Sequence, residues 1–120
     1  MAASKIKLAI KQGATFRQRL TWKTGTPATL VNLTGWTARM QLRADITDPV
    51  VLLTLDTENG GIVLGGAAGT IDLYIGHVAT AGFTWESAVL DLEMVAPGPD
   101  GDVIRLVEGV ATNSFEVTRV

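Results

Sequence analysis

The residue types that most often perform catalysis are sparse in this chain. His77 is the only histidine, and it follows an alternating segment that ends at Gly76. Histidine is a common general acid or base, but this position has no evident partner and favours a solvent-exposed loop. The three serines, Ser4, Ser87 and Ser114, lie outside any Gly-x-Ser-x-Gly nucleophile elbow. We therefore predict that the protein is not an enzyme.

Acidic side chains are the remaining candidates for a metal site or a catalytic carboxylate pair. Asp100 and Asp102 flank a glycine directly after a proline, and Pro-Asp-Gly is typical of a type I turn. Calcium loops use more ligands at wider spacing and end on a glutamate. Asp45, Asp48 and Glu58 form a looser group. We expect no metal and no cofactor, while a glycosidase-like carboxylate pair stays open because the sequence selects no two partners.

Phosphate and nucleic-acid binding are both disfavoured by the pattern of residues. The glycine-rich segment 60–69 lacks P-loop and dinucleotide spacing and precedes no predicted helix, so it is interpreted as turns. Phe16 and Trp22 are in the opposite strand phase to Arg17 and Arg19. Because the aromatic rings then face the core and the cations face water, they cannot form one base-stacking platform. We predict no nucleic-acid partner.

Length and composition indicate one globular domain over residues 1–120. The chain is 47% hydrophobic and has 13 glycines, 4 prolines and no cysteine, which excludes a disulfide scaffold and thiolate chemistry. No apolar run reaches the roughly 18 residues of a membrane helix, so we expect no membrane partner. Residues 1–11 lack the apolar core of a secretory signal. Synthesis in the cytoplasm is the resulting expectation, with residues 1–11 as an N-terminal arm or edge strand.

Short alternating segments separated by turn residues dominate the chain. From Ala38 to Arg43, apolar residues occupy every second position, as in a strand with one buried face. Similar alternation covers 5–11, 16–23, 71–75 and 88–94, and a nearly continuous apolar run covers 50–55. Further strands are expected at 62–64, 103–111 and 115–120, with one helical turn at 78–82. The sequence thus predicts an all-β fold, an immunoglobulin-like β-sandwich of about eight antiparallel strands.

Alternation also predicts which side chains form the core and where one strand is irregular. Gln18 falls on the apolar face of its segment, which a bulge or an inward hydrogen bond would explain. Trp36 is placed to close one end of the core. The residues expected to pack between the two sheets are Trp22, Trp36, Met40, Leu42, Leu73, Leu90 and Leu92.

Charge is divided unevenly along the chain. Residues 1–44 hold eight basic residues and no acid, whereas 45–120 hold twelve acids and two basic residues, giving +8 and −10 (8 − 0 and 2 − 12). Basic strands beside acidic strands in one sheet would explain this division. Head-to-tail assembly through patches of opposite sign is a second explanation, and nucleic-acid binding is the least favoured.

Several of these segments together resemble small β-sandwich modules of bacteriophage tails and baseplates. The Leu-Thr-Gly-Trp-Thr-Ala-Arg-Met-Gln-Leu-Arg segment at 33–43 is similar to a motif that recurs in that family. Five further segments are similar to motifs of that family and occur in the family's order: 12–16, 69–75, 89–94, 105–110 and 116–119. The resemblance implies the fold of the N-terminal domain of upper baseplate proteins and related short tail proteins.

What the resemblance implies is a non-enzymatic structural component of a tailed-phage or prophage virion. The expected role is in the tail, the baseplate or fibre attachment, with other virion proteins and further copies of this chain as partners. Capsid decoration or head–tail joining is an alternative, and a carbohydrate-binding or hydrolytic β-sandwich is another of a different class. The expected location is the virion, after synthesis in the bacterial cytoplasm.

The residues expected to form protein contacts combine the charged outward positions with two apolar residues near the N-terminus. We expect Lys5, Lys7, Lys11, Arg17 and Arg19 to form one basic patch, because consecutive strands often pair. This patch would meet acids on late strands of another copy, with Ile6 and Leu8 supplying the lasting affinity. The predicted interface residues are Lys5, Ile6, Lys7, Leu8, Arg17, Arg19, Asp72, Asp91 and Glu93.

Overall fold

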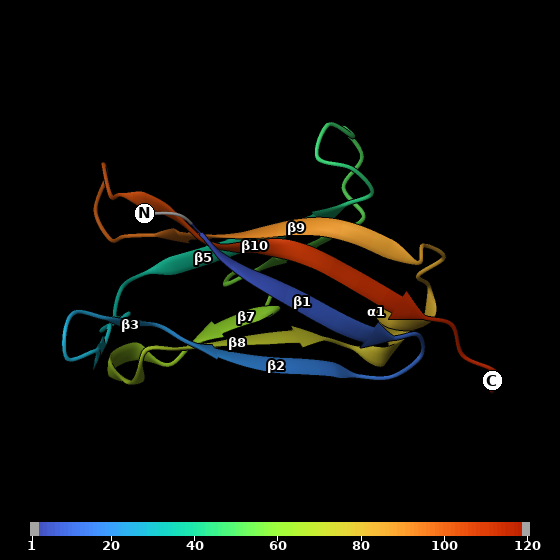
Figure 1. The fold of residues 1–120 in the computed structure, drawn as a ribbon, viewed down its shortest axis with the longest axis horizontal. Coiled ribbons are helices and arrows are strands. Elements are labelled where there is room, and N and C mark those ends of the chain that lie inside the picture. The colour runs from blue at the N-terminus through green and yellow to red at the C-terminus, as the bar shows by residue number, and fades with distance from the viewer. Residues whose placement is uncertain (1–2, 119–120) are drawn as a thin grey trace.

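The computed structural model describes residues 3–118 and consists mainly of β-strands (Figure 1). In chain order the elements are β1 (Ser4–Lys11), β2 (Phe16–Thr21), β3 (Lys23–Thr24), β4 (Thr29–Leu30), β5 (Thr37–Arg43), β6 (Leu53–Asp56), β7 (Ile62–Leu64), the 3₁₀ turn η1 (Gly66–Ala68), β8 (Thr70–Ile75), the α-helix α1 (His77–Ala81), β9 (Ser87–Val95) and β10 (Val103–Ser114). The all-β prediction is confirmed.

Two sheets of unequal size form two layers, as the ribbon shows (Figure 1). The large sheet has the strand order β1-β10-β9-β5-β6, and the small sheet has the order β2-β8-β7. A two-stranded hairpin, β3-β4, lies at one end of the molecule (Figure 1). The helix α1 connects the small sheet to the large one at the other end, where a helical turn was predicted.

The core fills the space between the two sheets, because each strand turns its apolar face inward. The large sheet contributes Leu8, Ile10, Met40, Leu42, Leu92 and Met94, all at most 1% exposed, and the small sheet contributes Ile62, Ile71 and Leu73. The predicted core residues Leu73 and Leu90 are likewise buried. Trp22 and Trp36 are only half-buried, and they pack edge to face against one another with ring centroids 5.4 Å apart.

The first strand departs from the predicted antiparallel arrangement. β1 pairs with β10 in parallel, with Ser4 opposite Val107 and Lys11 opposite Ser114. It is an edge strand of the large sheet. β2 follows after a short turn but pairs with β8 in the small sheet. The chain therefore changes sheet between its first two strands, which is why they do not form a hairpin.

Three local predictions also need correction. The segment predicted as a last strand shows no strand over its described part, 115–118, and its final residues 119–120 lie outside the described residues. The apolar run at 50–55 is not a buried strand throughout, because Val50 is 60% exposed and only β6 is paired. Gln18 is half-buried in a strand of unbroken register, so of the two explanations for its place on the apolar face the bulge is excluded.

The register shift of the fold lies instead in β10, between Arg105 and Val107. It places one extra residue in β10, so that Val107 and Ala111 face the core while Glu108 and Val110 face outward. Two positions beyond Val107, Gly109 lies directly beside Ile6 of β1. A Cβ at position 109 would lie 2.9 Å from the carbonyl carbon of Ile6 and closer still to its oxygen. The parallel pairing of β1 thus depends on a glycine there.

Candidate functional site: the outer faces of the two sheets

The structure divides the predicted interface residues between two outer faces. Lys5, Ile6, Lys7 and Leu8 lie on β1, and Asp91 and Glu93 lie on β9, so all six belong to the large sheet. Arg17, Arg19 and Asp72 belong to the small sheet. The expected single basic patch is therefore wrong, because β1 and β2 lie in different sheets.

One of the expected contact residues is not on the surface. Leu8 points into the core and is 0% exposed, so it cannot supply apolar contact area to a partner. Ile6, two residues earlier on the same face, is half-buried and packs against the core. The alternation of β1 puts both residues on its inner face, opposite the lysines.

Three ion pairs cross the outer face of the large sheet between neighbouring strands. They join Lys5 Nζ to Glu108 Oε1 at 3.6 Å, Arg105 Nε to Asp91 Oδ2 at 3.5 Å, and Arg39 Nε to Glu93 Oε1 at 2.7 Å. The predicted acids Asp91 and Glu93 thus lie beside cations of their own sheet. Two of these pairs, Lys5–Glu108 and Arg39–Glu93, join a basic residue of 1–44 to an acid of 45–120, as the first explanation of the charge division expects. Exposed pairs of this kind contribute about 0.2–1 kcal/mol each and mainly orient a partner.

A shallow depression of about 670 Å³ occupies this outer face. The charged residues of the three ion pairs line it, together with apolar residues, of which Ile46, Val89 and Val110 are not buried. Ile46 belongs to the loop 44–52, which projects above the sheet (Figure 1). Ile46 is 81% exposed. Arg43 anchors the loop at its start by donating a hydrogen bond of 2.9 Å to the carbonyl of Asp48.

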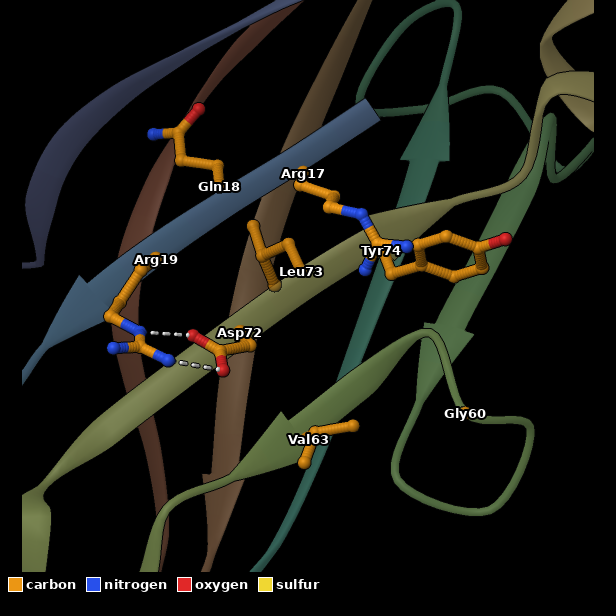
Figure 2. A pocket seen from close by; sticks show the side chains of 8 residues that line it. All are labelled: Arg17, Gln18, Arg19, Gly60, Val63, Asp72, Leu73 and Tyr74. Carbon is orange, nitrogen blue, oxygen red and sulfur yellow. Dashed lines mark hydrogen bonds and ion pairs between the residues drawn. The ribbon is translucent and has the colours of Figure 1, made fainter. Parts of the chain in front are cut away.

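The outer face of the small sheet carries a second depression, of about 570 Å³ (Figure 2). Arg19 donates two hydrogen bonds to Asp72, of 2.7 and 3.0 Å, across the β2–β8 pairing. The hydrogen bond from Arg19 lowers the pKa of the Asp72 carboxyl below its usual value, and the same bond raises the pKa of Arg19. Arg17 lies over the ring of Tyr74 at 4.6 Å from its centroid, a cation–π contact.

The residues first considered for catalysis lie apart from both depressions. His77 is exposed at the start of α1, and Asp100 and Asp102 are exposed in the turn between β9 and β10. Asp45 and Asp48 accept hydrogen bonds from backbone N–H groups of their own loop, as turn residues commonly do. Among residues 3–118, no group of three or more histidine, cysteine or acidic side chains is placed to hold a metal ion.

The apolar centre of the large depression was not predicted from the sequence, although a signal was present. Val89 and Val110 occupy the outward phase of strands whose other outward residues are mostly charged or polar. An apolar side chain at a solvent-facing strand position is the signal that could have found them. Ile46 could not have been found in this way, because it lies in a loop without periodicity.

No protein-family model matches the chain, and no curated protein is significantly similar to it. Within the described part of the chain, no helix is long and apolar enough to cross a membrane.

Proposed function

We propose that this chain is a non-enzymatic structural component of a tailed-bacteriophage or prophage virion, acting through protein–protein contacts in the tail, the baseplate or the attachment of a fibre. Support comes from the phage-like segments, four of which lie mostly in a strand. The segment 33–43 ends in β5, 69–75 covers β8, 89–94 lies in β9 and 105–110 lies in β10. The segment 12–16 is mostly the turn before β2, and 116–119 contains no strand over its described part.

The observation that carries the proposal is the composition of the large outer face. Protein interfaces commonly have an apolar centre surrounded by polar and charged residues that stay partly hydrated. Val89 pairs with Val110 across β9 and β10 and Ile46 lines the same depression, so apolar residues lie here beside the three cross-strand ion pairs. The projecting loop 44–52 adds the exposed Val50 and Val51 beside Ile46, which increases the apolar area available to a partner.

We also propose that the two sheets form an immunoglobulin-like sandwich. Residues 3–118 form ten strands, and without the two-residue strands β3 and β4 eight remain (10 − 2), in two sheets of five and three. Sandwiches of this class use two packed sheets of mostly antiparallel strands around one core. The parallel pairing of β1 with β10 is the departure from that arrangement in this chain.

The experiment that tests the proposed function is imaging of phage particles that carry a labelled copy. A short epitope inserted between Pro99 and Asp100 would lie in an exposed turn and leave both sheets intact. Antibody-bound gold should decorate the tail or baseplate in negative stain, and particles with the untagged chain should stay bare. Label on the capsid would support the decoration or joining alternative instead. Tagged protein found only outside particles would contradict a virion role.

A further inference from the structure

The outer edge of β1 has unpaired backbone groups within residues 3–118. β1 is the last strand of the large sheet and pairs only with β10. Successive residues of a strand direct their N–H and C=O groups to alternate edges. The N–H of Gln12 points to β10, where it donates to Ser114 at 2.9 Å, and the register of β1 is unbroken. The backbone groups of Lys5, Lys7 and Ala9 therefore point to the open edge.

The core is also less well covered on this side of the molecule. β1 and β2 are joined by the turn 12–15 and separate toward the end at which β1 begins (Figure 1). Near the turn, Leu8, Ile10 and Phe16 are buried. Toward the separated end, Ile6 and Leu20 are only half-buried. An added strand along β1 would cover these two side chains.

Charge decides which kind of strand fits. The outward side chains of β1 include Lys5, Lys7 and Lys11, and among the described residues only Lys5 makes an ion pair. Like charges directly opposite each other in neighbouring strands are destabilising, and opposite charges are favourable. A second copy of β1 added antiparallel about Lys7 would place Lys7 opposite Lys7. The lysines thus disfavour self-pairing, a common protection of sheet edges.

We infer that the open edge of β1 binds, as an added strand, an extended segment of another protein that alternates acidic and apolar side chains. Its acidic side chains would face Lys7 and Lys11 on the outer surface. Its apolar side chains would pack over Ile6 and Leu20 between the sheets. Main-chain hydrogen bonds give such strand addition its affinity, and the alternating side chains give it specificity. The inference rests on the proposed function only in taking the partner to be a virion protein.

The test uses the whole chain and a fluorescent synthetic peptide of alternating glutamate and valine, as long as the 8 residues of β1. Fluorescence anisotropy should give a dissociation constant on the order of 0.1–1 mM, since a short isolated strand binds weakly. Amide chemical-shift changes should lie in β1 and β2. A matched peptide of alternating lysine and valine should bind at least about tenfold more weakly.

The decisive variant is Ala9→Pro, which removes a backbone N–H from the open edge without changing charge or the bonds to β10. It should weaken peptide binding about tenfold, whereas Ala9→Ser, which keeps that N–H, should bind like the wild type. Circular dichroism checks that Ala9→Pro remains folded. If Ala9→Pro does not remain folded, the double variant K7E/K11E tests the inference instead. This double variant should bind the lysine peptide more tightly than the glutamate peptide.

Several results would overturn the inference. They are equal binding to Ala9→Pro and Ala9→Ser, shifts confined to another surface, and no exchange of peptide preference in K7E/K11E. Sedimentation that shows dimers of the wild type but monomers of Ala9→Pro would also overturn it, because the occupant would then be a second copy. If the gold label decorates tails but the peptide does not bind the chain, this inference is rejected and the proposed function stands. If the peptide binds but the gold label is absent from particles carrying the tagged chain, the proposed virion role is rejected and this inference stands.

Discussion

Replacing Gly109 with alanine should detach part of β1 from the large sheet. Gly109 faces Ile6 across the parallel β1–β10 pairing. A new Cβ would be 3.0 Å from the nitrogen of Ile6, 2.9 Å from its carbonyl carbon and in collision with the carbonyl oxygen. All three atoms belong to the backbone, so no rotation of a side chain can relieve the contact. β1 must move away from β10 at this point.

The expected loss of stability follows from what β1 contributes. The backbone hydrogen bonds next to Ile6 contribute about 1 kcal/mol each, so losing two costs about 2 kcal/mol. Full detachment would also expose Leu8 and Ile10, now 0% and 1% exposed, at about 1.5–3 kcal/mol each. That total would rival the whole stability of a domain of this size. We expect an intermediate loss of about 2–4 kcal/mol, with β1 displaced around Ile6 and held near the turn.

Urea unfolding and limited trypsin digestion together measure this effect. The transition midpoint of Gly109→Ala should fall, and trypsin should cut more rapidly after the lysines of β1. Gly82→Ala is the matched control, because its Cβ would meet no atom closer than 3.5 Å and its φ is −85°. That control should stay within about 1 kcal/mol of the wild type. A loss below about 0.5 kcal/mol for Gly109→Ala, with unchanged digestion, would refute the reasoning.

Three further predictions concern the core, one turn and one ion pair. Leu73→Ala and Leu90→Ala should each cost about 2–5 kcal/mol in urea unfolding, and losses under about 0.5 kcal/mol would mean that neither fills the core. Asn59→Ala should cost about 1–2 kcal/mol by the same measurement, because the Asn59 side chain bonds three backbone groups of its turn. Asp72→Asn should flatten the acid side of the profile of melting temperature against pH. Arg19 lowers the folded-state pKa of Asp72, so this stabilisation is present at neutral pH and is lost as pH falls through that lowered pKa. Parallel profiles for the variant and the wild type would contradict this.

The strands were predictable because alternation and turn residues are local properties. The segment 38–43 alternates strictly, and β5 has the corresponding pattern of buried and exposed residues. The glycine-rich residues 58–61 and 65–69 interrupt strands on either side of β7 as expected. The prediction of a strand over the whole run 50–55 was wrong, because apolar composition without periodicity does not identify a strand. Its first residues instead belong to the exposed loop beside Ile46.

What the sequence determined by itself was the position of most of the strands, their inward phase and the all-β class of fold, since these follow from local residue patterns. Only the tertiary structure decided which strands share a sheet. A turn of the length of 12–15 permits either a hairpin or a change of sheet, and β1 pairs with a strand about one hundred positions away in the chain. That choice separates the lysines of β1 from Arg17 and Arg19 and places Asp91 and Glu93 beside cations of their own sheet. The candidate surfaces follow from the same choice, because interactions between charges depend on their distance in space and not on their spacing in the chain.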